Sequence, residues 1–189
     1  MKHAASRALH AYWDRLRKGR TAPERSDLDP GAIRGLLGDV YLLELGGLRP
    51  FLIRLAGTRL CALFCRELRG GSLDSLFAPD DRLEFVALID EVVGTMTPVV
   101  AGLQGETAEG HSLDLELLAL PLRHRGRTHA RLFGALAALD VPYWVGTVPL
   151  ARLRLVSVRR LQPGLAGLEA EAVRARPTGR LRVLPGGRA

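Results

Sequence analysis

Two adjacent stretches have the pattern of long β-strands, and together they restrict the fold more than any other feature of the sequence. Residues 112–122 (SLDLELLALPL) alternate leucine with Asp114 and Glu116, as expected for a strand with one face on a core and the other toward solvent. After the turn HRGRT, residues 129–139 (HARLFGALAAL) are apolar on both faces from Leu132 onward. A strand that is apolar on both faces lies inside a sheet whose two faces are covered. The sequence therefore predicts a sheet with packed elements on each side.

The first 22 residues predict an amphipathic helix that would supply one of these covers. Leu9, Tyr12, Trp13 and Leu16 fall at i, i+3, i+4 and i+7, which places them in one apolar stripe. The sequence leaves two uses of this stripe open. The stripe packs on the sheet of its own domain, or it forms a dimer or partner interface.

Three further strands complete the predicted sheet. Residues 40–45 (VYLLEL) and 51–56 (FLIRLA) are separated by a Gly-Gly turn and predict a hairpin. Residues 98–103 predict one more strand. With the two long strands, the sequence predicts a five-stranded sheet.

Two helices are predicted between the hairpin and the third strand. A short one follows Thr58, which we expect to be its N-cap. A longer one begins near the sequence Pro-Asp-Asp, where Asp81 and Glu84 have the spacing of a capping box. Both helices carry apolar residues at helical spacing, so each is expected to pack on the sheet.

The positive charge of the chain is concentrated near its C-terminus. Residues 150–189 contain nine Arg and two Glu, whereas residues 1–149 contain 18 basic and 18 acidic side chains, so the formal net charge of +7 lies in the last forty residues. Residues 140–160 are partly apolar and are expected to lie along the domain. The remainder lacks a sustained period and predicts disorder. The chain is thus predicted to have three parts: an N-terminal helix over 1–22, a domain over 23–160, and a basic, disordered tail over 161–189.

The order of the predicted elements resembles that of a PAS domain. The segments AYWDRLRKGRTAPERSDLDP, LAGTRLCALFCRELRGGSL and SLDLELLALPLRHRGRTHARLFGAL are similar to a family of short, stand-alone bacterial PAS proteins, common in alphaproteobacteria. The likeness covers about residues 3–160. It implies an α+β fold: a single PAS-like domain with a five-stranded antiparallel sheet, helices on one face and an N-terminal amphipathic helix.

The resemblance also implies a role. PAS domains bind a small ligand or cofactor between the sheet and the helices, or they bind other proteins. We therefore expect an intracellular sensory or regulatory module that acts in signal transduction and is not an enzyme. The expected partners are signalling proteins such as a kinase or regulator, a second copy of the chain, and a small-molecule ligand. The family does not name a cofactor. The expected pocket is lined by Leu55, Leu60, Cys61, Phe64, Phe77, Phe85, Ile89, Leu115 and Leu117.

Cys61 and Cys65 lie four residues apart on the predicted short helix. Zinc requires three or four converging ligands, and no third ligand is spaced near these two, so no metal site is expected. Redox pairs use the spacing Cys-x-x-Cys, and a disulfide along one helix would be strained. The cysteine block of flavin-binding PAS domains is missing, and no His follows Asp81 on the long helix to hold haem. We expect both cysteines to be small apolar residues.

The sequence leaves two other classes of function open. A nucleic-acid-associated protein would use the Arg-rich tail, and its salt-sensitive binding would disappear on removal of residues 162–189; nucleic acid is nevertheless not the expected partner. An enzyme would need a buried ionisable group in the pocket, and the sequence nominates none. The sequence contains no run of about 18 uninterrupted apolar residues, so no transmembrane helix is expected. The absence of an export signal and the two free cysteines predict a cytoplasmic protein.

Overall fold

The computed structural model describes residues 1–46 and 51–161 of the 189-residue chain. For residues 127–129 it describes the backbone only. The predicted tail over 161–189 therefore lies outside the described residues, except for Leu161. The same holds for part of the predicted Gly-Gly turn.

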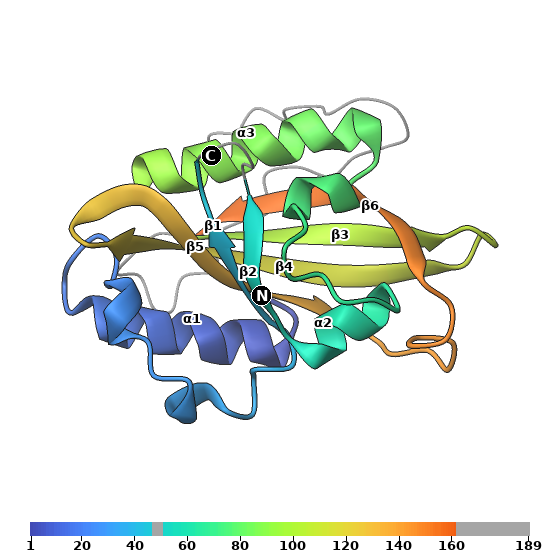
Figure 1. Cartoon of the computed structure of the whole chain (residues 1–189), viewed down its shortest axis with the longest axis horizontal. Helices are drawn as coiled ribbons and strands as arrows, with labels where there is room; N and C mark the ends of the chain where they lie inside the picture. Colours follow the sequence, from blue (N-terminus) through green and yellow to red (C-terminus); the bar gives the residue numbers. More distant parts are fainter. Residues whose placement is uncertain (47–50, 162–189) are drawn as a thin grey trace, which may run out of the picture.

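One antiparallel sheet forms the centre of the molecule, with the strand order β2-β1-β5-β4-β3-β6 (Figure 1). The strands are β1 (Val40–Glu44), β2 (Leu52–Ala56), β3 (Val99–Thr107), β4 (Ser112–His124), β5 (Arg127–Ala138) and β6 (Leu150–Arg160). The helices are α1 (Ala4–Arg17), α2 (Thr58–Leu63) and α3 (Pro79–Thr95), and three short 3₁₀ turns are η1 (Arg25–Asp27), η2 (Gly31–Ile33) and η3 (Leu73–Leu76). The two long strands β4 and β5 lie in the middle of the sheet, which confirms the position predicted for the strand that is apolar on both faces.

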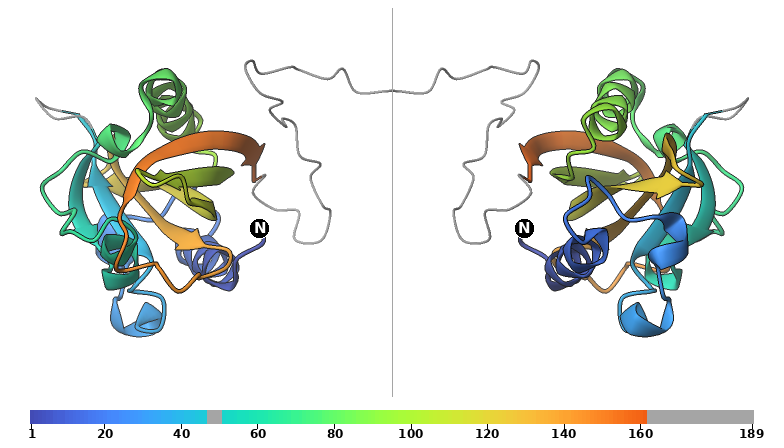
Figure 2. Two further views of the ribbon diagram at one scale, coloured as in Figure 1. Left: turned by 90° about the vertical axis from the view of Figure 1, so that its right-hand side faces the viewer. Right: turned by 90° about the vertical axis from the view of Figure 1, so that its left-hand side faces the viewer.

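Both faces of the sheet are covered (Figure 2). On one face, α2, η3 and α3 enclose a large apolar cluster that includes Phe85, Leu117 and Leu136. On the other face, α1 encloses a second cluster that includes Trp13 and Leu118. The prediction of helices on one face and a separate N-terminal helix is therefore confirmed.

The structure contains six strands in place of the predicted five. The sixth strand, β6, pairs with β3 along its whole length, from Leu150 opposite Thr107 to Arg160 opposite Val99. The pairing shifts register twice, once near Gly102 and once near Thr107. Each shift interrupts the alternation of inward and outward side chains, which explains why the sequence pattern of this segment does not indicate a strand.

The apolar stripe of α1 packs on its own sheet. Trp13 is fully buried, and its indole Nε1 donates a hydrogen bond to the carbonyl oxygen of Pro121 in β4 at 2.9 Å. The Tyr12 hydroxyl accepts the backbone N–H of Asp29 at 2.7 Å. Leu9 is fully buried beside them, and Leu16 packs against the same cluster. Of the two uses that the sequence left open, the structure shows the first.

The outward position predicted for Glu116 is wrong. Glu116 is only 5% exposed. Its carboxylate accepts hydrogen bonds from the backbone N–H groups of Lys2 at 2.5 Å and His3 at 3.0 Å. A carboxylate at the start of a helix is favourable because the unpaired amides there carry partial positive charge. Glu116 thus ties the first turn of α1 to β4.

The predicted caps of α2 and α3 are also wrong. Helix α3 follows Ala78 without a side-chain cap. The carboxylate of Asp81 instead accepts the backbone N–H of Leu155 at 3.2 Å, inside the protein. Asp81 therefore joins α3 to β6, the strand that the sequence does not reveal. The N-cap of α2 is Gly57, one residue before Thr58.

The stability of the α1 face should depend weakly on pH through His10. Burial lowers the pKa of His10 below 6.5, and the nearby Asp14 carboxylate opposes this shift only in part. Because the folded-state pKa is depressed, the contribution of neutral His10 is present above about pH 6.5 and is lost as pH falls toward the folded-state pKa. We expect a lower melting temperature at about pH 5.5 than at about pH 7.5, and a smaller decrease in the variant His10→Gln. Equal pH dependence in both proteins would contradict this assignment.

None of the helices in the described part of the chain is long and apolar enough to cross a membrane.

Candidate functional site

The space between the sheet and the helices, where the sequence predicted a pocket, is filled by side chains. Phe77 stacks on Phe85 with ring centroids 4.1 Å apart, and Phe51 meets Phe85 edge-on at 6.1 Å. Seven of the nine predicted lining residues are buried in this one cluster: Leu60, Phe64, Phe77, Phe85, Ile89, Leu115 and Leu117. The structure thus brings them together as core.

Leu55 does not belong to this cluster. It is 41% exposed, although Ile53 two residues earlier is buried. The register between β1 and β2 shifts so that Leu55 pairs with Leu42 while Ile53 pairs with Leu43. This bulge moves Leu55 to the opposite face of the sheet from Ile53. The predicted position of Leu55 in the pocket is therefore wrong.

Cys61 and Cys65 are free thiols. Cys61 is partly buried against the apolar cluster, close to Glu67, and burial raises the pKa of its thiol. Cys65 is exposed. Among the described residues, no group of three or more His, Cys, Asp or Glu side chains could hold a metal ion.

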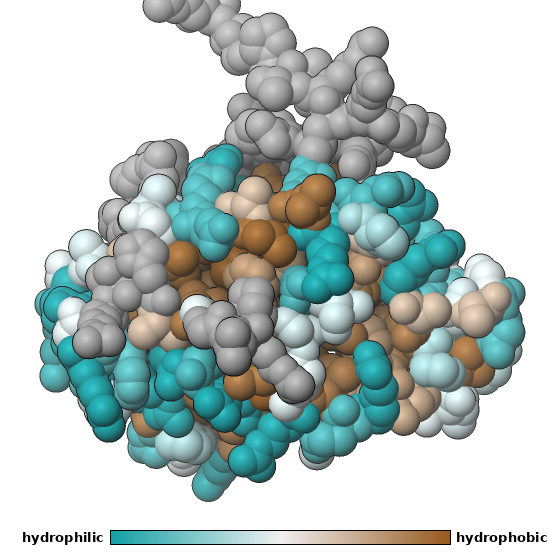
Figure 3. All heavy atoms as spheres, turned by 45° about the horizontal axis from the view of Figure 1, so that its top comes forward, coloured by the Kyte–Doolittle hydropathy of each residue, from teal (hydrophilic) through white to brown (hydrophobic). Residues whose placement is uncertain are grey.

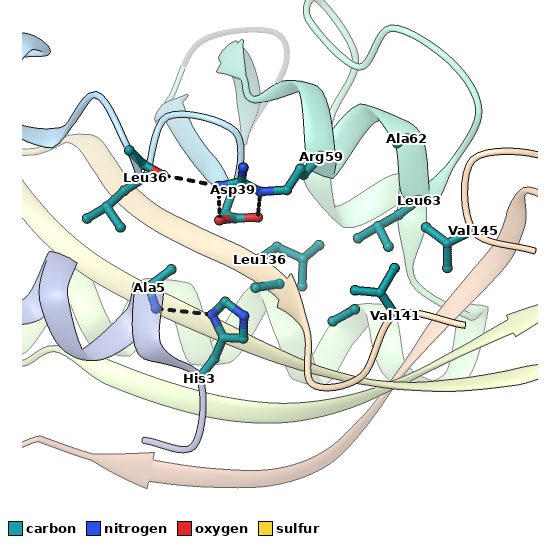
Figure 4. Close-up of a pocket in the computed structure, with 13 residues that line it drawn as sticks. His3, Ala5, Leu36, Asp39, Arg59, Ala62, Leu63, Leu136, Val141 and Val145 are labelled. Atoms are coloured by element: carbon teal, nitrogen blue, oxygen red, sulfur yellow. Dashed lines mark hydrogen bonds and ion pairs between the residues drawn. The ribbon is translucent and has the colours of Figure 1, made fainter. Parts of the chain in front are cut away.

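A pocket of about 460 Å³ lies outside the filled interior, at the end of β5 (Figure 4). Its walls come from five segments: the first turn of α1 (His3, Ala5), the loop 35–39, helix α2 (Arg59, Ala62, Leu63), the end of β5 (Leu136–Ala138), and residues 141–145. This volume is in the range of small-molecule sites. None of the nine predicted residues is among those that line it.

The pocket exists because β5 is longer than its neighbour. The pairing of β1 with β5 ends at Val40 opposite Ala135, so residues 136–138 continue beyond β1. The Leu136 N–H still donates to the carbonyl oxygen of Asp39 at 3.0 Å, which holds the loop 35–39 at the side of β5. The start of α1, helix α2 and residues 141–145 enclose the rest of this strand end.

Gly57 allows the loop to approach α2. A Cβ atom at this position would lie 2.2 Å from the carbonyl oxygens of Leu37 and Gly38, a distance that any larger residue could relieve only by moving the backbone. The close approach brings Asp39 next to Arg59. Gly57 therefore fixes the geometry of the polar side of the pocket.

Asp39 and Arg59 form that polar side. The Asp39 carboxylate is 8% exposed, and it accepts hydrogen bonds from Arg59 Nε at 2.8 Å and Nη2 at 2.6 Å. This bidentate geometry is the strongest arrangement for an arginine–carboxylate pair. The same hydrogen bonds raise the pKa of Arg59 above its usual value. The pair is thus charged and self-neutralising.

His3 stands on the opposite side. Its Nδ1 accepts the backbone N–H of Ala5 at 3.2 Å, so the ring caps α1. In Figure 4 the second ring nitrogen points away from Ala5, toward the pocket. The side chain therefore belongs to the helix and to the pocket at the same time.

A second, smaller hollow of about 130 Å³ lies between α3 and β6. Leu88, Leu155 and Val158 line it, and the ion pair between Glu91 and Arg160 closes one side. On this face of the molecule, apolar atoms gather near the middle and charged or polar atoms surround them (Figure 3). The hollow holds less than a third of the volume of the first pocket, so the first is the stronger candidate site.

Comparison with known proteins gives one family. The model of the family described as "PAS domain" matches residues 1–137, which include α1 and most of β5. No curated protein sequence matches the chain.

Several solved structures have a similar backbone. A structure titled as an RNA-binding light-oxygen-voltage receptor has 14% identity and a TM-score of 0.46, over 60% of this chain and 33% of that one. The LOV protein of Rhodobacter sphaeroides has 15% identity and a TM-score of 0.45, over 56% and 61%. A PAS domain from Colwellia psychrerythraea has 13% identity and a TM-score of 0.46, over 58% and 97%. The chain thus spans about a third and about three fifths of the first two of these chains.

Proposed function

This chain belongs to the PAS domain family, and we propose that it is a sensory module that binds a small molecule in the pocket at the end of β5 and signals through α1. The observation that carries the proposal is that the pocket and α1 share a wall. His3, the N-cap of α1, and Ala5 in its first turn both line the pocket. A ligand there would touch the helix directly.

The signal in this proposal is a change in how firmly α1 is held on the sheet. The pocket is complete only while α1 is docked, because His3 and Ala5 lie on that helix. A ligand that fits the complete pocket binds the docked state better than the released state, and it therefore shifts the equilibrium toward docking. Two hydrogen-bonded links to β4 must open on release: the contact of Glu116 with the amides of Lys2 and His3, and the hydrogen bond from Trp13 to Pro121.

The output of the module would pass to another protein. Release of α1 would expose its stripe of Leu9, Tyr12, Trp13 and Leu16, together with the apolar sheet face that this stripe now covers. Either surface could then bind a signalling protein, such as a kinase or regulator, or a second copy of the chain. In this proposal the stripe predicted as a partner interface has that role only when the pocket is empty.

The Arg-rich tail lies outside the described residues. The arginines Arg152, Arg154 and Arg160 of β6 lie within ion-pair distance of acidic side chains. This pairing gives no support to a nucleic-acid surface on β6. The match to the PAS family supports a sensory role, and that is the role we propose.

Blocking the pocket should remove the ligand without unfolding the protein. We propose the variant Gly35→Trp, because Gly35 lines the pocket, has no positive φ angle, and has open space where a Cβ would be placed. The matched control is Gly94→Trp on α3, which has the same open space. The measurement is native mass spectrometry of the full chain purified from cells.

The wild-type chain and Gly94→Trp are expected to carry a small-molecule adduct, and Gly35→Trp is expected to lose most of it. Retention of the same adduct by Gly35→Trp would place the ligand elsewhere. A wild-type chain that carries no adduct and whose melting temperature no added small molecule raises would contradict a sensory ligand site.

A further inference from the structure

Building on the proposed function, we infer that the pocket selects a neutral, largely apolar molecule that carries a hydrogen-bond acceptor such as a carbonyl group. The juxtaposition that supports this is a self-neutralised ion pair on one side, a histidine that can only donate on the other, and aliphatic walls between them. Each part of this arrangement excludes one class of ligand.

Charge complementarity excludes ions. Among the described residues that line the pocket, Asp39 and Arg59 are the two with full charges, and they neutralise each other through two hydrogen bonds. A ligand carboxylate would have to compete with Asp39 for Arg59 and would lie close to a buried like charge. A ligand ammonium would have to compete with Arg59 for Asp39 and would lie close to the positive charge of Arg59. A neutral ligand pays neither cost.

His3 supplies one hydrogen-bond donor. Its Nδ1 accepts the amide of Ala5, so in the neutral ring the proton is on Nε2. Among the described residues no partner is recorded for Nε2, and Figure 4 shows this side of the ring directed toward the pocket. The side chain can therefore donate a hydrogen bond to a ligand and cannot accept one.

The donors of Arg59 serve the protein itself. Its Nε and Nη2 bind Asp39, and Nη2 also reaches the carbonyl oxygen of Gly35 at 3.3 Å. Nη1 lies against Gly38, 3.0 Å from where a Cβ of that residue would be placed, and Gly38 does not line the pocket. His3 Nε2 is therefore the donor that faces a ligand.

The walls between His3 and the ion pair are aliphatic. Leu36, Leu63, Leu136, Val141 and Val145 line the pocket, together with four alanines. Val141 is 73% exposed, so a ligand would remove apolar surface of the protein from water as well as its own. An apolar body with an acceptor at its edge matches both features.

The test uses four naphthalenes substituted at the same ring position, which differ only in one group: methyl naphthyl ketone, ethylnaphthalene, naphthoate and naphthylmethylammonium. Each is titrated into the full chain at about pH 7.5, and binding is followed by the amide NMR signals of Ala5, Ala62 and Ala137. The ketone should bind roughly three- to tenfold more tightly than ethylnaphthalene, as expected for one net hydrogen bond. The two ions should bind about tenfold more weakly than the ketone.

Two variants separate the donor from the ion pair. His3→Ser keeps an oxygen that can cap α1 but removes the Nε2 donor, and it should lower the affinity for the ketone more than the affinity for ethylnaphthalene. Arg59→Lys keeps a positive charge beside Asp39 and leaves His3 in place, so it should not change the ratio of the two affinities. An equal loss for both probes in His3→Ser would show that the residue only shapes the pocket, and would overturn its assignment as the donor.

The outcomes separate this inference from the proposed function. If ketone and ethylnaphthalene bind at the pocket amides with equal affinity, or if naphthoate binds most tightly, the inference about ligand class is wrong while the pocket remains a ligand site. If none of the four probes shifts the pocket amides, the inference fails together with the proposed site.

Discussion

Replacing Phe85 by alanine should lower the free energy of unfolding by about 3–5 kcal/mol. Phe85 is fully buried, stacks on Phe77 and meets Phe51 edge-on. Its loss removes apolar contacts and leaves a cavity in the centre of the larger cluster, which the neighbouring rings can fill only in part. The measurement is urea denaturation followed by circular dichroism.

The matched control for Phe85 is on the same helix. Leu83 is 79% exposed, so Leu83→Ala should change the free energy of unfolding by less than about 0.5 kcal/mol. Phe85→Ala should also leave the binding of methyl naphthyl ketone at the end of β5 unchanged. If Phe85→Ala cost less than about 1 kcal/mol, the interior would not be the packed core described above, and a pocket there would again be expected.

Replacing Trp13 by alanine should cost about 3–5 kcal/mol and should also loosen α1. The indole is fully buried and donates to the carbonyl oxygen of Pro121. The substitution removes a large apolar side chain and leaves a buried carbonyl group without its donor. Because α1 forms one wall of the pocket, ketone binding should weaken in the same variant.

Two further variants make the effect of Trp13 specific. Trp13→Phe keeps much of the apolar contact and should recover part of the stability. Arg15→Ala on the exposed side of α1 should have almost no effect. If Trp13→Ala destabilised the protein and left ketone binding unchanged, α1 would be a structural cover only.

Much of the fold follows from the sequence because long apolar patterns determine it. The stripe that contains Leu9 and Trp13 predicts α1, and the residues from Leu132 onward predict a strand covered on both faces. Both predictions are confirmed. A stripe of this kind must be removed from water in the folded protein, so its pattern predicts a helix without knowledge of the surface that covers it.

The errors occur where a local rule was overruled by a distant contact. The alternation in β4 places Glu116 on a polar face, but that face is where α1 begins, and the free amides of Lys2 and His3 supply partners for the carboxylate. Asp81 has the spacing of a cap, but it binds the backbone of β6, 74 residues later in the sequence. In both cases the amide that binds the carboxylate is far away in the sequence, so a local pattern cannot predict the contact.

The site was missed for a related reason. Asp39 and Arg59 are 20 residues apart, and His3 comes from yet another element. Their convergence depends on the length difference between β1 and β5 and on the close approach at Gly57. The sequence gives a hint only at Gly57, which lies between a strand and a helix. The resemblance correctly predicted a PAS domain, but the pocket that it implied lies in an interior that this chain fills with its own side chains.

The most direct test of the account is hydrogen exchange of the full chain, measured by mass spectrometry with and without methyl naphthyl ketone at saturating concentration. If pocket occupancy holds α1 on the sheet, the ligand raises the equilibrium constant for docking of α1. Exchange of the amides in residues 4–17 should become slower by the same factor, while exchange in α3 changes little. Unchanged exchange in α1, with the ketone bound at the end of β5, would contradict the claim that this pocket signals through the N-terminal helix.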